Sequence, residues 1–383
     1  MDNVGELSVA GFGEQLRELS ETVTQERASF DSAGRLPDDL FRRLAAIGLF
    51  RLWLPVGLGG PELSALDFMD VVEEAAALEG TIGWLAGNGG GMARVGAFLP
   101  VHAAREIFAD PDAFVVSATG AVGRAVPVAG GYRVTGRWPF GSGAAHGTWF
   151  SPLCEVEASG QGSGCLIYPV VPRADVFLHD NWQVSGLCAT GSVDFELRDV
   201  FVPDRFVLEF QPEPTQPGTL YRLPTSAIFT WTVATVPLGI ARGAVAEFVR
   251  LAKHKNRRGD AVPLAERELV QSEVGRIEAR LCAARAFLRQ SMTDLLEAVA
   301  AGSDAVPARV RFRLACTFAS EAALWAIGQV TQMAGAVAIL RSCPLERYER
   351  DARAAAKHIA MSPAAYITGG KLVLGQDLSQ ARF

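Results

Sequence analysis

The spacing of apolar residues changes twice along this chain, which divides it into three zones. From about residue 10 to 110, apolar residues recur near the 3.6-residue period of a helix, as at Leu40, Leu44 and Ile47. Between about 114 and 210 the chain consists of short β-rich runs separated by Gly and Asp. Long amphipathic stretches then return, at 238–252, 264–299 and 307–332. The pattern predicts a mostly helical α+β chain with domains at 1–113, 114–212 and 224–383, the last an antiparallel helical bundle.

Charge and cysteine content narrow the class of protein. Lys and Arg number 36 against 42 Asp and Glu, and this net charge of −6 argues against a broad nucleic-acid surface. The six cysteines form no Cys-x-x-Cys pair and no metal-like cluster with the five histidines, which favours a reduced compartment and no structural metal. The start of the chain is acidic, unlike a signal peptide, and no apolar run reaches the length of a membrane span. We therefore expect a soluble cytoplasmic protein with neither nucleic acid nor membrane as a partner.

One histidine near the C-terminus is a candidate catalytic residue. His358 closes the stretch 345–358, which is rich in alanine and arginine and is expected to form one helix. Asp351 and Ala354 lie within two turns, on or near the same helical face. A neutral imidazole is the side chain best suited to take a proton near pH 7, so a carboxylate-held His358 beside a cavity is a candidate base. The alternative is a histidine that only caps or packs.

Two stretches of the β-rich zone combine tryptophan with glycines and hydroxyls, a mixture suited to a flat conjugated ligand. In the first, 138–149, Trp138 or Trp149 would stack on such a ligand, while the Ser142 hydroxyl and the backbone at Gly143 would supply hydrogen bonds. The second, 181–192, ends in Thr190-Gly-Ser192. Two such stretches in one small domain favour a shared ligand. The alternative is a β-bulge or hairpin with tryptophans in the core.

Two helix ends in the C-terminal zone are weaker candidates. Residues 253–259, which include Arg257, offer five potential cations to a phosphate, although a solvated basic helix end is the commoner explanation. Gln332 and Gly335 end another helix, where a plain glycine cap is the alternative. The sequence contains no dinucleotide-binding, P-loop or nucleophile-elbow motif.

Taken in order, several short phrases resemble the acyl-CoA dehydrogenase family over nearly the whole chain. They are Ile47-Gly-Leu-Phe-Arg51 with Pro55-Val-Gly-Leu-Gly-Gly60, Gly186-Leu-Cys-Ala-Thr-Gly-Ser192 with Val200-Phe-Val-Pro203, and Gln332-x-x-Gly335 ahead of Arg347-x-x-Arg350-Asp351. The resemblance implies a helical N-terminal domain, a small central β-barrel or sandwich, and a C-terminal four-helix bundle.

Within that family the chain resembles the flavin-dependent monooxygenases that are oxygenase components of two-component hydroxylases. The phrases that carry this are Trp138-x-Phe-x-Ser142-Gly143-x-x-His146-x-x-Trp149 and Arg350-Asp351-x6-His358. The resemblance implies that a separate reductase supplies reduced flavin (FADH2 or FMNH2), which with O2 forms a C4a-(hydro)peroxyflavin that hydroxylates an aromatic or polycyclic small molecule. A homotetramer is also implied.

The resemblance also implies roles for individual residues. His358 would be the base that deprotonates a phenol or steadies the oxygenated flavin, and Ser142 would assist it. The isoalloxazine would contact Trp138, Ser142, Gly143, Thr190 and Ser192. The flavin tail would contact Arg257, Gln332 and Gly335.

The absence of a particular acid makes the chain resemble the oxygenases more than the dehydrogenases of this family. An acyl-CoA dehydrogenase needs a carboxylate to remove the α-proton of its thioester, yet residues 358–366 contain no glutamate and 228–240 contain no acid. Cys188 stands where many relatives have arginine, and residues 89–94 offer no second histidine. Two alternatives remain: an acyl-CoA dehydrogenase with a displaced base, and a non-catalytic flavin-binding scaffold.

Overall fold

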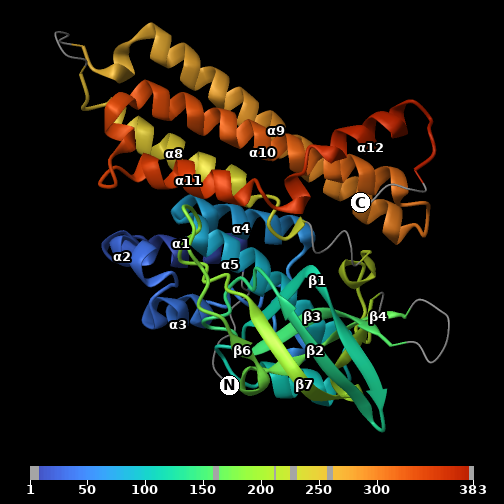
Figure 1. Cartoon of the computed structure of the whole chain (residues 1–383). Helices are drawn as coiled ribbons and strands as arrows, with labels where there is room; N and C mark the ends of the chain where they lie inside the picture. Colours follow the sequence, from blue (N-terminus) through green and yellow to red (C-terminus); the bar gives the residue numbers. More distant parts are fainter. Residues whose placement is uncertain (1–7, 158–163, 211–212, 225–230, 257–261, 379–383) are drawn as a thin grey trace. The chain divides into compact units, whose positions relative to one another are not determined.

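The computed structural model describes residues 8–157, 164–210, 213–224, 231–256 and 262–378 (Figure 1). Its packing forms two compact units. The mixed unit combines residues 1–64, 85–184 and 188–225, and the helical unit combines 65–84, 185–187 and 226–383. Residues 65–84 therefore belong with the C-terminal helices, although the sequence pattern assigns them to the N-terminal zone.

The mixed unit begins with helices, and two of their ends have clear caps. The helices are α1 (Val9–Glu18), α2 (Ser20–Ala33), α3 (Asp38–Ala46) and α6 (Val101–Phe108). The Ser8 hydroxyl accepts a hydrogen bond from the Gly11 amide at 3.2 Å, which caps α1. α2 ends at Gly34, whose φ of +63° suits glycine. Leu40 and Leu44 are buried in α3, which confirms the helical period predicted there.

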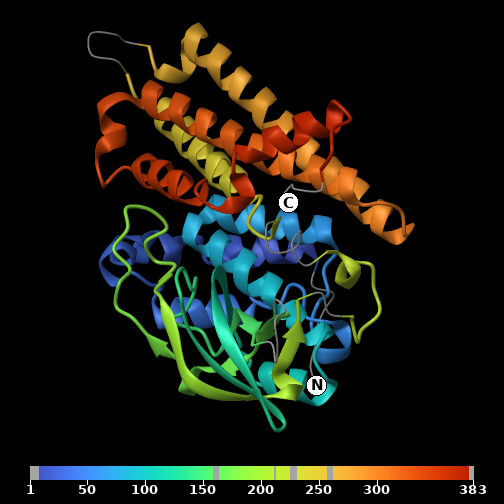
Figure 2. The ribbon, with the colours of Figure 1, turned by 45° about the vertical axis from the view of Figure 1, so that its right-hand side comes forward.

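One sheet of eight strands completes the mixed unit (Figure 2). Its hydrogen-bonded order is β6-β7-β2-β1-β3-β4-β8, with β5 paired to β3. β1 pairs antiparallel with β2 and parallel with β3. The strands are β1 (Val115–Val128), β2 (Gly131–Trp138), β3 (Trp149–Val156), β4 (Leu166–Pro169), β5 (Val171–Pro172), β6 (Phe177–Leu178), β7 (Phe195–Pro203) and β8 (Val207–Glu209). The β-rich central zone is thus confirmed.

The helical unit is a bundle of long helices (Figure 1). It comprises α4 (Ala65–Leu78), most of α5 (Gly80–Leu85), α8 (Val236–Ala252), α9 (Glu268–Ala300), α10 (Val306–Ala334), α11 (Pro344–Ala355) and α12 (Ala364–Val373). α10 contacts α8, α9, α11 and α12, and α4 packs on α8. The three longest helices predicted from the sequence are confirmed, with ends shifted by a few residues.

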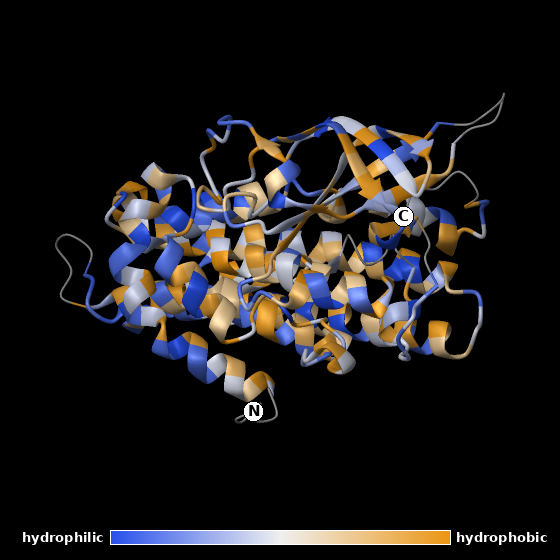
Figure 3. Ribbon diagram, turned by 90° about the horizontal axis from the view of Figure 1, so that it is seen from below, coloured by the Kyte–Doolittle hydropathy of each residue, from blue (hydrophilic) through white to orange (hydrophobic). Residues whose placement is uncertain are grey.

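The central helix of this bundle is unusually apolar. Among the described residues, one helical stretch, 306–339, is long and apolar enough by composition to cross a membrane, so the expectation that no apolar run has that length is wrong for this stretch. Figure 3 shows apolar and polar residues distributed around the helices. The apolar side chains of α10 include Val310, Phe312 and Ile327, which are buried in the bundle core. Burial between neighbouring helices therefore accounts for these side chains, although only 39% of the most apolar window of the stretch is buried.

Glycines on α8 allow close approach of the neighbouring helices. A Cβ at Gly243 would lie 2.4 Å from the carbonyl oxygen of Ala77 in α4 and 2.7 Å from the Tyr348 ring in α11. At Gly275 in α9, a Cβ would meet nothing within 4 Å.

We expect Gly243→Ala to destabilise the protein, because overpacking costs roughly 1–3 kcal/mol while the gain in helix propensity is only about 1 kcal/mol. Gly275→Ala has the same propensity gain without the clash, so it should raise stability by about 0.5–1 kcal/mol. Denaturant unfolding of both variants measures the difference. Equal stabilisation by the two alanines would contradict close packing at Gly243.

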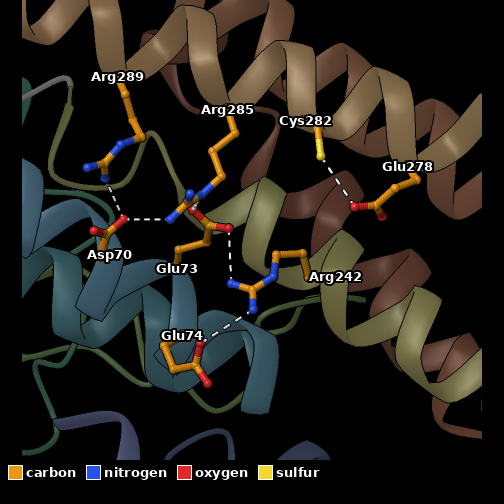
Figure 4. A network of polar contacts seen from close by, with 8 residues as sticks. All are labelled: Asp70, Glu73, Glu74, Arg242, Glu278, Cys282, Arg285 and Arg289. Atoms are coloured by element: carbon orange, nitrogen blue, oxygen red, sulfur yellow. Dashed lines mark hydrogen bonds and ion pairs between the residues drawn. The ribbon is translucent and has the colours of Figure 1, made fainter. Parts of the chain in front are cut away.

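A network of ion pairs joins α4 to α8 and α9 (Figure 4). The Glu73 carboxylate is almost fully buried and accepts hydrogen bonds from Arg242 Nη1 at 3.1 Å and Arg285 Nε at 2.8 Å. The neighbouring Asp70 accepts from Arg285 Nη2 at 2.7 Å and from Arg289 Nη1 at 2.6 Å. Two acids of one helix are thus each held by two arginines.

Candidate functional site

The two predicted ligand stretches of the mixed unit meet in a cluster of three hydroxyls. Ser142 Oγ lies 2.8 Å from Ser192 Oγ, which lies 2.7 Å from Thr190 Oγ1. Thr190 and Ser192 are buried, whereas Ser142 is only partly buried. The accessible end of the array is therefore the Ser142 hydroxyl. We call Ser142, Thr190 and Ser192 the hydroxyl cluster.

Backbone hydrogen bonds keep the two stretches in register. The Gly143 amide donates to the Thr190 carbonyl at 2.7 Å, and the Gly141 amide donates to the Val193 carbonyl at 3.0 Å. Gly143 has a φ of +80°, and a Cβ there would lie 2.4 Å from the Phe114 ring. Only glycine fits this position, both for its backbone and for its close contact. The sequence predicted Ser142, Gly143, Thr190 and Ser192 as one site, and the structure brings them together.

Trp138 does not present a face to a ligand. Its side chain is fully buried, stacks on Phe195 with ring centroids 5.4 Å apart, and donates from Nε1 to the Leu153 carbonyl at 2.9 Å. Its ring also fills the space left by a glycine, because a Cβ at Gly123 would lie 2.1 Å from Trp138 Cζ2. The expectation that Trp138 stacks on the cofactor is wrong. The alternative of a core tryptophan describes it correctly.

In the helical unit, three successive residues of the second stretch are attached to α11. The Leu187 amide donates to Asp351 Oδ1 at 2.7 Å, and Arg350 Nη1 donates to the Ser185 carbonyl at 3.0 Å. A Cβ at Gly186 would lie 2.2 Å from the Arg350 carbonyl oxygen. Burial, followed by repulsion from Glu79, raises the pKa of the Asp351 carboxyl above its usual range. Through its hydrogen bond from the Leu187 amide, Asp351 attaches residues 185–187 to α11.

His358 lies beyond the helix that the sequence predicts for it. α11 ends at Ala355, and His358 precedes a short 3-10 turn, Ile359–Met361. The helix stops because His358 is extended, with φ −65° and ψ 145°, and its Nδ1 accepts a hydrogen bond from the Ala360 amide at 3.2 Å. The expectation that Asp351 holds this imidazole is also wrong, because Asp351 binds the Leu187 amide instead.

The environment of His358 keeps its imidazole neutral. Burial, followed by repulsion from Arg313, lowers the pKa of His358 to about 4. The Trp84 ring packs against the imidazole edge, with centroids 5.6 Å apart at 79°. Arg313 Nη2 also donates to the Ile359 carbonyl at 2.8 Å, which fixes the turn. Since Nδ1 accepts from Ala360, the proton of the neutral ring lies on Nε2.

The residues predicted for a phosphate-bearing tail are not assembled into a site within the described residues. Gln332 and Gly335 are exposed at the end of α10, where Gly335 is the cap residue with a φ of +68°. Lys255 Nζ donates to the Ala334 carbonyl at 2.5 Å at the same helix end. The glycine-cap alternative thus describes Gly335. Arg257 lies outside the described residues.

Two residues near these sites had no role assigned from the sequence. His146 lies four residues after Ser142, and its spacing in the Ser142-Gly143-x-x-His146 phrase was the available signal. Arg313 lies in α10, far along the chain from His358, and no sequence pattern links the two. Such a link depends on tertiary packing alone.

Comparisons with known proteins agree with this architecture. Residues 12–98 match the acyl-CoA dehydrogenase N-terminal domain, and residues 231–363 match the acyl-CoA dehydrogenase C-terminal domain. Together these matches cover more than half of the chain.

Several similar proteins are named as monooxygenases or hydroxylases. The chain is 30% identical to a pigment production hydroxylase of Rhodococcus sp., over 85% of this chain and 86% of the relative. It is 28% identical to the oxygenase subunit HsaA of a flavin-dependent monooxygenase of Rhodococcus jostii, over 93% of this chain and 96% of the relative. Among solved structures, XiaF from Streptomyces sp. in complex with FADH2 and glycerol superposes with a TM-score of 0.88 at 26% identity, covering 98% of each chain.

Proposed function

We propose a function from the premise that this chain belongs to the acyl-CoA dehydrogenase family, in its flavin-dependent monooxygenase branch. It is the oxygenase component of a two-component system that hydroxylates an aromatic or polycyclic small molecule with reduced flavin and O2. The observation that carries this proposal is the neutral imidazole of His358 in the segment where a dehydrogenase requires a carboxylate. An imidazole with so low a pKa is a poor base for an α-proton.

The hydroxyl cluster fits the cofactor of this family. A flavin ring has hydrogen-bond donors and acceptors along one edge, and a hydroxyl meets either kind. Ser142 is the accessible member of the cluster, with Ser192 and Thr190 behind it. We assign Ser142, Gly143, Thr190 and Ser192 to the ring of the flavin, while the assignment of Arg257, Gln332 and Gly335 to its tail stays a prediction from the family resemblance. Reduced flavin supplies the two electrons with which one oxygen atom enters the substrate and the other leaves as water.

The role of His358 follows from its tautomer. A neutral ring whose Nδ1 accepts the Ala360 amide has Nε2–H as its outward group. His358 therefore acts as a hydrogen-bond donor. Its Nε2–H donates either to an oxygen atom of the substrate or to the O2-derived oxygen that reacts with it. This differs from the base role expected from the sequence, because deprotonating a phenol would require giving up the Ala360 hydrogen bond.

The partners follow from the same proposal. A separate flavin reductase supplies the reduced cofactor, and the protein works in the cytoplasm as a homotetramer. Exposed apolar side chains on and after α12, at Ile367, Val373 and Leu374, support association, because neighbouring subunits would cover them.

The test is anaerobic titration with reduced FAD and reduced FMN, followed by turnover with a flavin reductase and a panel of phenols and indoles. We expect tight binding of one reduced flavin and oxygen-dependent product formation. No binding of either reduced flavin rejects the proposal. Binding without any product favours a silent scaffold, and bleaching of bound oxidised FAD by an acyl-CoA favours a dehydrogenase with a displaced base.

We expect Ser142→Ala to weaken reduced-flavin binding by roughly five- to tenfold, the loss of about one hydrogen bond. The matched control is Ser117→Ala, which removes a partly buried hydroxyl bonded to the Ser151 carbonyl on the sheet. Its flavin affinity should equal that of the wild type. Equal affinities of all three proteins would remove Ser142 from the cofactor site.

A further inference from the structure

His146 connects the turn that carries Ser142 to the N-terminal helices. Its Nε2 lies 3.0 Å from the Leu36 carbonyl oxygen, and its ring stacks on Phe41 with centroids 4.1 Å apart at 11°. A carbonyl oxygen only accepts, so Nε2 is the protonated nitrogen. The His146 amide donates to the Gly143 carbonyl at 2.9 Å, which closes the turn after Ser142. Side chain and backbone of one residue thus fix this turn.

The same N-terminal segment also contacts the second hydroxyl-bearing stretch. Arg35 and Thr190 form an antiparallel bridge. A Cβ at Gly191 would lie 3.3 Å from the Gly34 carbonyl oxygen, so the backbones approach closely there. Residues 34–36, between α2 and α3, therefore contact Thr190 directly and the Ser142 turn through His146. We call residues 34–36 the bridging segment.

The charge state of His146 is consistent with this arrangement. Burial lowers the pKa of His146, although the Asp38 carboxylate opposes that effect. Asp38 Oδ1 lies 3.6 Å from Nδ1, and Arg35 is the nearby cation that disfavours a charged ring. In the neutral ring the proton lies on Nε2, where it is directed at the Leu36 carbonyl oxygen.

We propose that His146 is a positioning residue for the flavin site. By donating to Leu36 and stacking on Phe41, it holds the Ser142 turn against the bridging segment. The Ser142 hydroxyl then stays within hydrogen-bond distance of Ser192, and the Gly143 amide within hydrogen-bond distance of the Thr190 carbonyl. The inference rests on the proposed function only for its consequence in flavin binding. The positioning itself is a property of the ligand-free protein.

Two substitutions separate the hydrogen bond from the ring. His146→Phe keeps an aromatic ring on Phe41 and removes the donor, whereas His146→Gln restores an amide donor of similar reach. The matched control is His179→Phe, because the side chain of His179 bonds Glu196 of β7 at 3.0 Å, and Glu196 lies outside the bridging segment.

Amide hydrogen exchange on the ligand-free proteins tests the positioning directly. In His146→Phe we expect faster exchange in residues 34–38, 141–149 and 188–193, with the long helices of the bundle unchanged. His146→Gln should restore most of the protection. Unchanged exchange in these three segments, or equally faster exchange throughout the chain, would overturn the proposal.

Binding of reduced flavin tests the consequence. His146→Phe should raise the dissociation constant by roughly five- to tenfold, with partial recovery in His146→Gln and no change in His179→Phe. If the wild type binds no reduced flavin, the proposed function fails, while the exchange result still decides the role of His146. If the wild type binds and His146→Phe binds equally well, the inference alone is overturned.

Discussion

Replacing His358 with alanine is expected to lower the rate of hydroxylation by roughly 10²- to 10⁴-fold while reduced flavin still binds. The imidazole is neutral, and its outward group is Nε2–H, since Nδ1 accepts the Ala360 amide. Alanine removes that donor and leaves the hydroxyl cluster of the mixed unit unaltered. Single-turnover product yield and the flavin dissociation constant, measured on the same protein, separate chemistry from binding.

The control for this substitution is His102→Ala, which removes an exposed histidine of α6 and should change neither quantity. Full product yield from His358→Ala would remove His358 from catalysis.

Protonation of His358 should lower both the stability and the activity of the protein at acidic pH. Because the folded protein lowers the pKa of His358 from 6.5 to about 4, it favours the neutral ring. The stability gained from this preference is complete above pH 6.5 and is lost as the pH falls through about 4. Activity that depends on the neutral ring should fall as the pH passes through about 4, and His358→Gln should lose this dependence. An acidic limb near pH 6.5 would contradict the buried environment.

Replacing Glu73 with alanine is expected to destabilise the protein by roughly 2–3 kcal/mol. The change leaves Arg242 and Arg285 without the buried carboxylate that accepts from both. Breaking a fully buried pair costs more, but these two arginine side chains are 46% and 42% exposed, so water partly replaces the lost acceptor. Urea unfolding, with the slope compared between variants, measures the loss.

The neighbouring acid provides the control. Glu74 contacts Arg242 at 3.5 Å and is far more exposed than Glu73, so Glu74→Ala should cost no more than about 0.5–1 kcal/mol. Both substitutions alter the same helix by one carboxylate. A loss of equal size at the two positions would show that charge number, and not the buried geometry, sets the stability.

Most of the fold could be predicted from the sequence because apolar residues recur at a regular helical spacing. The positions of α8, α9 and α10 were predicted within a few residues, since long amphipathic stretches leave few alternatives. Residues 65–84 were assigned to the wrong neighbours, because periodicity shows which face is buried and not what covers it.

Some residues of the candidate site could be placed from the sequence and others could not. Ser142, Thr190 and Ser192 were grouped correctly because short polar stretches in one small domain have few places to meet. Trp138 was misjudged, since an indole beside glycines fills core space as readily as it stacks on a ligand. His358 was placed on a helix because nothing in the local sequence shows that its own ring caps the next turn.

The turn after His358 is fastened from α10, by Arg313 to the Ile359 carbonyl and by Thr317 Oγ1 to the Ser362 carbonyl at 3.0 Å. Side chains of α10 thus influence both the pKa of the His358 imidazole and the turn that orients it. Substitutions at these two α10 positions would change the surroundings of His358 without replacing the imidazole itself. Variants with altered oxygenation should therefore arise at Arg313 and Thr317.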